Sequence, residues 1–151
     1  MLEPTDFQAA ILADTCEVFT SAFNQAVDLG WHADISNATK LHYLAYYPVK
    51  AAHPTLVSDL INQARVKAAE ALRSAFALRK QTERPVTQPQ SHACPPRYNK
   101  NTYRVDWPSR TVRLSTTAGR QTLRFCVPPY AEKYTDFPTD TADLIWKRGR
   151  W

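Results

Sequence analysis

Glycine, cysteine and long apolar runs are scarce in this 151-residue chain, and each scarcity excludes a class of protein. The three glycines are too scattered to form a glycine-rich loop that wraps nucleotide phosphates. The three cysteines, Cys16, Cys94 and Cys126, include no CxxC pair, which argues against a disulfide framework or a zinc knuckle and favours a reducing compartment. No apolar run approaches the roughly 18 residues of a membrane span, and the N-terminus MLEPTDF does not resemble a signal peptide. We therefore expect a cytoplasmic protein without a membrane partner.

Clusters of catalytic side chains are also missing. A nuclease of the ribonuclease-H type needs several carboxylates around a pair of Mg²⁺ ions. The four histidines share no metal-ligand spacing, and Cys16 fits the apolar face of a helix better than it fits a Cys–His nucleophile. We predict no catalytic residue, no metal, no cofactor and no enzyme activity for this chain. The carboxylates considered for a metal site are scattered along the sequence: Glu70, Asp106, Asp136, Asp140 and Asp143.

Positive charge is concentrated in the second half of the chain. Residues 1–80 carry seven basic and eight acidic residues (net −1), whereas residues 81–151 carry twelve and six (net +6). Between Arg97 and Arg124, seven cations stand against one carboxylate, Asp106, and six of the seven are arginine. Arginine forks bind phosphate in a bidentate manner, and a surface that only maintains solubility usually mixes both signs. The distribution indicates a polyanionic partner, most simply a nucleic acid.

The first 30 residues predict a long helix. Thr5 followed by Gln8 is a capping-box pattern, and apolar residues recur at helical spacing from there on. Gly30 is well placed as a C-cap, so we expect the helix to extend over about 6–29. Its apolar residues form two stripes, which indicates packing on more than one neighbour.

Two further segments complete a predicted helical lobe over residues 1–80. LHYLAYY (41–47) is short and aromatic, and Pro48 is positioned to open a brief helix. Pro54 can start a long helix. Apolar residues from Val57 to Ala75 then follow the i, i+3, i+4, i+7 pattern without a miss.

A proline-containing linker is predicted over residues 81–97. After it, apolar residues alternate with polar ones, as in strands, and no longer recur at helical spacing. Residues 98–151 read as a small antiparallel sheet or partial barrel, with at least three strands between 102 and 127, a further strand over 142–146 and an ending, 147–151, that resembles a hairpin turn cut off before its second strand. The fold class is therefore α+β. The apolar side chains expected to point one way are Tyr103, Val105, Trp107, Val112, Leu114, Leu123, Phe125 and Val127.

The cationic side of this sheet is the candidate site. Arg104, Arg113 and Arg124 alternate with the apolar residues, so we expect them to face outward together and to contact phosphates. A plainer interpretation is that these cations solvate an exposed face or protect a sheet edge from aggregation. The full set of residues predicted to bind nucleic acid is Arg104, Arg113, Arg124, Arg97, Lys100, Arg110, Arg120 and Lys80.

The order of these segments resembles the N-terminal half of TnpB, the insertion-sequence proteins once called OrfB transposases and related to type V CRISPR nucleases. Neither of the sharpest parts of the resemblance, the arginine-and-aromatic strands and the helix ending in Lys80, is a catalytic motif. The resemblance covers nearly all of the chain. The segments that carry it are LHYLAYY (41–47), ARVKAAEALRSAFALRK (64–80), RYNKNTYRVDWPSRTVRLSTTAGRQTLRF (97–125) and ADLIWKRGRW (142–151).

The resemblance implies a division of labour between the two parts. In this family the helices form a recognition lobe and the strands a wedge-like barrel. Together they hold a structured guide RNA and help to read target DNA, while a downstream ribonuclease-H-like domain with a zinc ribbon makes the cut. Family members usually begin with a strand, where this chain has only residues 1–3, and they continue beyond Trp151 with the partner strand and the catalytic domain. We therefore expect an excised or decayed, shortened form without nuclease activity.

Two alternatives stay open. The chain could be a transposase remnant or a protein-interaction module without a nucleic-acid function, in which case the wide apolar surface of the first helix would support self-association of the helical half. It could also be an enzyme whose site the sequence does not reveal.

Overall fold

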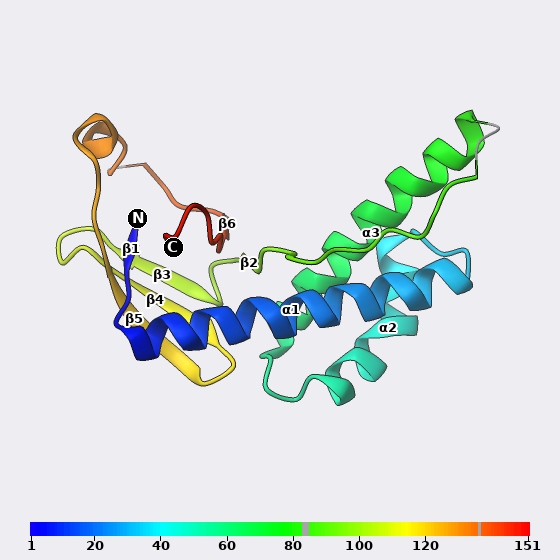
Figure 1. Ribbon diagram of the computed structural model, residues 1–151, viewed down its shortest axis with the longest axis horizontal. Helices are drawn as coiled ribbons and strands as arrows, with labels where there is room; N and C mark the ends of the chain where they lie inside the picture. The colour runs from blue at the N-terminus through cyan, green and yellow to red at the C-terminus, as the bar shows by residue number, and fades with distance from the viewer. Residues whose placement is uncertain (83–84, 136) are drawn as a thin grey trace.

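The computed structural model describes residues 1–82, 85–135 and 137–151. Within them the chain forms three α-helices, one 3₁₀-helix and short antiparallel strands, so the predicted α+β class is confirmed. Figure 1 shows a curved molecule in which the sheet forms one arm, α3 rises in the other, and α1 runs along the base of both. The elements in chain order are β1 (Leu2–Glu3), α1 (Asp6–His32), α2 (Ala38–Ala52), α3 (Ser58–Gln81), β2 (Arg97–Tyr98), β3 (Tyr103–Asp106), β4 (Thr111–Thr116), β5 (Gly119–Phe125), η1 (Pro129–Tyr134) and β6 (Ala142–Asp143).

The main sheet has the order β1-β5-β4-β3, and all of its neighbours are antiparallel. The three strands predicted between residues 102 and 127 are therefore present. A fourth comes from the N-terminus, because Leu2 pairs with Phe125. Within the described residues the sheet does not close into a barrel. A separate two-stranded ladder joins β2 to β6.

Helix α1 starts where the capping box predicts it. The backbone N–H of Gln8 donates to the Thr5 hydroxyl, and the backbone N–H of Thr5 donates to Gln8 Oε1 at 3.1 Å. The predicted C-cap at Gly30 is wrong, because the helix continues to His32. Gly30 is instead buried where α1 touches its neighbours, and a Cβ there would lie against the Leu72 side chain and 2.9 Å from the Ile35 carbonyl oxygen. The glycine thus permits close packing of helices and does not end one.

The predicted starts of the next two helices are also wrong. Helix α2 begins at Ala38, because the Asn37 side chain accepts the N–H groups of Thr39 and Lys40, and it runs through Pro48 without ending. Helix α3 begins at Ser58, four residues after Pro54. In α2 the burial of one stripe against α1 and α3 outweighs the local cost of an internal proline. That stripe consists of Leu41, Ala45 and Val49.

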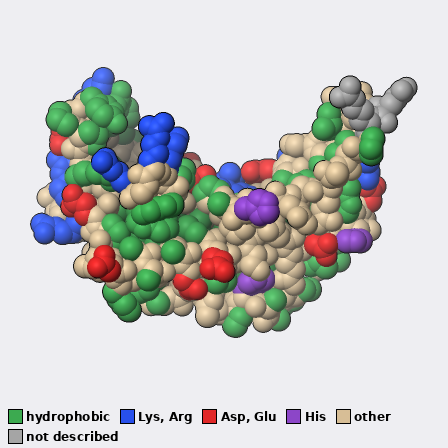
Figure 2. All heavy atoms as spheres, in the orientation of Figure 1, with side chains coloured by type: hydrophobic (Ala, Val, Ile, Leu, Met, Phe, Trp, Pro, Cys, Tyr) green, Lys and Arg blue, Asp and Glu red, His purple; other side chains and the backbone are tan. Residues whose placement is uncertain are grey.

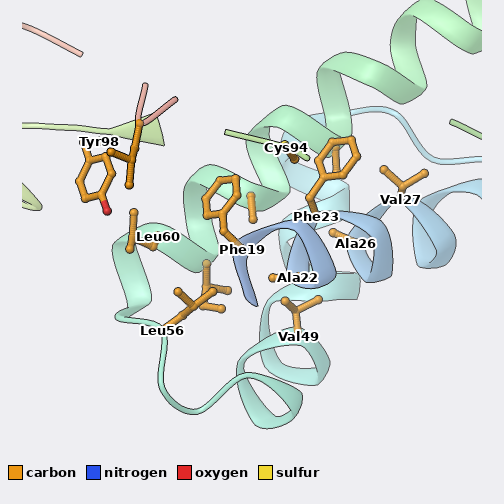
Figure 3. Packing of buried hydrophobic residues seen from close by; sticks show 14 of the residues in the cluster. Phe19, Ala22, Phe23, Ala26, Val27, Val49, Leu56, Leu60, Cys94 and Tyr98 are labelled. Atoms are coloured by element: carbon orange, nitrogen blue, oxygen red, sulfur yellow. The ribbon is translucent and has the colours of Figure 1, made fainter. Parts of the chain in front are cut away.

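One apolar core joins the three helices to the sheet. Figure 3 shows Phe19 and Phe23 projecting from α1 toward α3, with Cys94 beside them. Tyr98 is fully buried at the boundary between helices and sheet, where its hydroxyl donates to the Ser115 carbonyl at 3.0 Å. Burial raises the pKa of this phenol above its usual range.

The described part of the predicted linker lies against the helices. Asn24 exchanges two hydrogen bonds with the Ser91 backbone, and the Cys94 N–H donates to the Thr20 hydroxyl at 3.0 Å. Lys67 Nζ donates to the Pro95 carbonyl at 2.7 Å. Residues 83–84 of this segment lie outside the described residues.

The C-terminal residues only partly follow the sequence expectation. The strand predicted over 142–146 is limited to β6, which pairs with β2 rather than with the main sheet. The turn at 147–150 is confirmed: Lys147 and Arg150 exchange backbone hydrogen bonds, and Arg148 and Gly149 both have positive φ, as in a type I′ hairpin turn. No helix in the described residues is long and apolar enough to cross a membrane.

Candidate nucleic-acid interface

The strand register brings arginines together on one face of the main sheet. Arg104 on β3 lies directly opposite Arg113 on β4, between the inward-facing pairs Tyr103–Leu114 and Val105–Val112. The apolar partners are buried or half-buried, whereas both arginines are exposed. The alternation predicted for these two strands is therefore present.

Four of the predicted cations line one hollow of about 380 Å³ at this face. Arg104 and Arg113 come from the strands, Lys100 from the turn before β3, and Arg120 from the start of β5. Arg120 donates from Nη2 to the Asn101 carbonyl at 3.4 Å, which holds its side chain across the hollow. Among the described residues, no carboxylate lines this space. We call it the cationic hollow.

Arg124 lies on the same face but outside the cationic hollow. Its partners across the ladders are Thr111 on β4 and Glu3 on β1. Opposite charges on directly opposed residues attract each other, although no ion pair within 4 Å joins Glu3 to Arg124 in the described residues. The register thus separates Arg124 from the four clustered cations.

Two other predicted residues are already neutralised by carboxylates. Arg97 makes a bidentate pair with Glu70 at 2.9 and 3.3 Å and approaches Asp143 at 3.8 Å. The hydrogen bonds that Arg97 donates to the Glu70 carboxylate raise the Arg97 pKa above its usual value. Arg110, in the turn after β3, pairs with Glu132 of η1 at 2.8 Å. These contacts attach β2 to α3, and the β3–β4 turn to η1.

Lys80 is remote from the other seven predicted residues. It lies in the last turn of α3, at the end of the helix that rises away from the sheet in Figure 1. In Figure 2, basic side chains are more numerous on the arm that contains the sheet and the C-terminal turn than on this helical arm. The structure thus brings together Lys100, Arg104, Arg113 and Arg120 and leaves the rest of the predicted set outside.

A second hollow, of about 220 Å³, adjoins the first and was not expected from the sequence. It shares Asn101, Thr102 and Arg120 with the cationic hollow and is bordered on the other side by Ser58 and Asp59 of α3. No local pattern could have revealed this, because the two sides are separated by some forty residues in the chain. The start of α3 therefore lies beside the arginine face.

Among the described carboxylates considered for a metal site, Glu70 and Asp143 both contact Arg97. No group of three or more potential ligands occurs in the described part of the chain. Asp143 is paired with Lys67 at 3.2 Å, and Asp106 accepts from the Ser109 N–H at 3.4 Å. Asp136 lies outside the described residues.

The opposite face of the sheet carries an apolar hollow of about 340 Å³. Aromatic rings form much of its wall, and two of them, Trp107 and Phe125, meet edge to face with centroids 5.4 Å apart. Trp151 lies at the rim, where its carbonyl accepts the Leu2 N–H at 3.0 Å. The two faces of the sheet thus differ sharply in chemistry.

No protein-family model matches this chain, and no curated protein matches its sequence.

Proposed function

We propose that this chain is a nucleic-acid-binding module, and that it corresponds to the part of a TnpB-like RNA-guided nuclease that holds guide RNA and helps to recognise target DNA. The observation that carries the binding proposal is the cationic hollow, where four basic side chains from β3, the turn before it, β4 and β5 converge, with no carboxylate among the described residues that line it. The TnpB-like assignment rests on the resemblance of the segments in sequence. The proposal assigns binding, and not cleavage, to these residues.

The hollow supports phosphate as the ligand for a physical reason. Like charges on neighbouring strands repel, so an arrangement without internal counter-ions is favourable only when anions from outside complete it. Within the described residues, Lys100, Arg104 and Arg113 form no ion pair, unlike Arg97 and Arg110. Guanidinium groups match phosphate oxygens in a fork geometry, and their backbone positions are fixed by a regular sheet.

A salt titration of RNA binding tests this proposal. The test variant is Arg104→Ala/Arg113→Ala/Arg120→Ala. The matched control, Arg73→Ala/Lys133→Ala/Lys147→Ala, removes the same charge from exposed positions outside the hollow. Arg65→Ala is a poor control, because Arg65 donates to the Ala38 carbonyl at 2.6 Å and so helps to hold α2 on α3.

We expect the test variant to bind a fluorescent RNA hairpin with a log–log salt slope smaller by about two, taking about 0.7 per lost phosphate contact. The control should change the slope by much less, because its cations do not converge on one phosphate site. Circular dichroism is used to check that both variants fold. An equal change in the two variants would mean that the binding is diffuse and that the hollow has no special role.

The apolar hollow favours a second candidate function, that of a protein-interaction module. A partner that covered Trp107 and Phe125 would bury aromatic surface that is now open to solvent. Sedimentation of the chain over a range of concentrations in the absence of nucleic acid distinguishes this candidate, since it alone requires protein association at high salt.

A further inference from the structure

The outer face of α2 carries an exposed aromatic cluster that the core does not need. Tyr43 and Tyr47 are 79% and 76% exposed, while Leu41, Ala45 and Val49 on the opposite side supply the buried stripe. Residues four apart lie on one face of a helix, about 6 Å apart along its axis. Tyr43 and Tyr47 therefore form one row along α2.

A second row runs beside the first. The rings of His42 and Tyr46 lie 5.0 Å apart at an angle of 30°, and Tyr46 meets Tyr47 edge to face at 5.2 Å. Lys50 continues this row, with its Nζ 5.6 Å from the centroid of the Tyr46 ring. We call the two rows together the tyrosine face.

Cations predominate among the charged residues of the tyrosine face, although Asp59 at the start of α3 is close enough to act electrostatically on Tyr46. Residues 35–58 contain Lys40, Lys50 and two histidines but no aspartate or glutamate. Carboxylates occur only beyond the ends of this stretch: Asp34 is paired with Arg79, and Asp59 is in the first turn of α3. Asp14 and Glu17 of α1 border the hollow at the far end of α2, beside His53. An aromatic surface with cations at both ends suits a partner that is planar and anionic.

The tyrosine face is also connected to the cationic hollow. Lys50 donates to the Ser58 hydroxyl at 3.0 Å, and Ser58 borders the second hollow, which shares Arg120 with the cationic hollow. A continuous surface therefore leads from Arg104 and Arg113, across the start of α3, to the rings of α2.

We infer that the tyrosine face is a stacking platform for unpaired bases of the same nucleic acid whose phosphates occupy the cationic hollow. This inference rests on the proposed function and adds to it a base-contacting surface on the helical lobe. Aromatic side chains bind single strands by stacking on base faces, which is largely independent of sequence, while nearby cations hold the backbone. A symmetric dimer through this face would instead bring Lys40 and Lys50 of two copies together, with Asp59 as the one nearby carboxylate among the described residues of α2 and the first turn of α3.

Two fluorescent probes of about 12 nucleotides separate base contacts from phosphate contacts. One is oligouridine; the other is an abasic strand with the same phosphates and no bases. We expect the unmodified chain to bind oligouridine about tenfold or more better than the abasic strand, as measured by fluorescence anisotropy. Tyr43→Ala/Tyr47→Ala should remove this preference and leave the affinity for the abasic strand unchanged.

Two variants act as controls. Tyr43→Phe/Tyr47→Phe keeps the rings and should keep the preference. Tyr130→Ala removes a tyrosine of similar exposure, 77%, from η1 and should have no effect. Alanine is favourable in an exposed helix, so loss of folding is not expected for the test variant, and circular dichroism verifies this.

The outcomes distinguish the platform from the proposed function. If the unmodified chain and the alanine variant prefer oligouridine equally, or neither prefers it, the inference that the tyrosine face stacks on bases is wrong. The proposal that the cationic hollow binds phosphate would still stand. If the unmodified chain binds neither probe at low salt, the proposed function fails as well. If the alanine variant instead abolishes concentration-dependent association without nucleic acid, the tyrosine face is a protein interface and the inference is overturned.

Discussion

Arg104 and Arg113 are directly opposed in the β3–β4 ladder, with exposed side chains on the same face of the sheet. Directly opposite side chains in an antiparallel pair have Cβ atoms about 5 Å apart, and like charges at that distance are destabilising. The free chain therefore keeps two like charges on directly opposite residues, at a cost in stability. An anion between them would remove the repulsion.

Arg104→Thr should therefore stabilise the free chain while weakening its binding to nucleic acid. Threonine suits an edge strand, and the repulsion across the ladder disappears, so we expect the free energy of unfolding at low salt to rise by about 0.2–1 kcal/mol. Urea denaturation measures the stability and a salt titration with an RNA hairpin measures the binding. If the variant lost stability at low salt, the two arginines would not repel each other in the free chain.

Arg97→Ala should lower the stability of the free chain and leave its binding to nucleic acid unchanged. The Arg97 pair with Glu70 is partly exposed and joins β2 to α3, so its loss should lower the free energy of unfolding by about 0.5–1 kcal/mol. The salt slope of RNA binding should stay the same, because this guanidinium is already neutralised. Arg124→Ala is the matched comparison, and a larger loss of RNA binding in Arg97→Ala than in Arg124→Ala would contradict this assignment.

Gly30→Ala should destabilise the helical lobe, although the same change usually stabilises a helix by about 1 kcal/mol. The added methyl group would meet the Leu72 side chain, the Ile35 carbonyl oxygen and a Leu41 methyl group. Overpacking of this kind costs about 1–3 kcal/mol, so the midpoint of thermal unfolding should fall. Ser74→Ala, at an exposed position of α3, is the control that should not lower it. A stabilised Gly30→Ala variant would show that α1 and α3 separate easily.

The thiols of Cys16 and Cys94 should react slowly with iodoacetamide while the chain is folded. Burial, with a smaller effect of Cys94, raises the Cys16 pKa from 9.0 to about 12, and burial also raises the Cys94 pKa. At pH 9 the Cys16 thiol should therefore stay protonated in the folded chain. Both thiols should be labelled faster in urea than in the folded chain, as mass spectrometry of alkylated peptides can show.

The same shift gives a pH dependence of stability. The raised folded-state pKa of Cys16 means that its contribution is complete below about pH 9 and is lost as pH rises toward 12, because only the unfolded chain then releases the proton. Stability should therefore fall less steeply over this window in Cys16→Ala. Equal slopes in the two proteins would mean that Cys16 titrates normally when folded.

Local periodicity was sufficient for the class of α1, α3 and the strands β3, β4 and β5. The capping box of Thr5 and Gln8 located the start of α1, and the alternation around Arg104 and Arg113 predicted their strands and their shared exposure. Both signals depend on residues within a few positions of one another, so the sequence contains them in full.

The helix boundaries at Gly30, Pro48 and Pro54 depended on tertiary packing. Glycine commonly ends helices and proline commonly opens them. At position 30, however, close contact with Leu72 requires a residue without a side chain. At Pro48 the helix continues because the stripe of α2 on either side of the proline is buried. Such preferences amount to a few kcal/mol at most and yield to the burial of a continuous apolar face.

The composition of the candidate site was likewise decided between distant segments. The sequence by itself determined that the region from Arg97 to Arg124 is rich in arginine and that its strands expose one basic side. Only the tertiary structure paired Glu70 with Arg97 and Glu132 with Arg110 and put Arg124 outside the hollow, leaving four cations around it. The physical reason is that charge neutralisation acts through space over a few ångströms, whereas each of these carboxylates lies more than 20 residues away along the chain from its arginine.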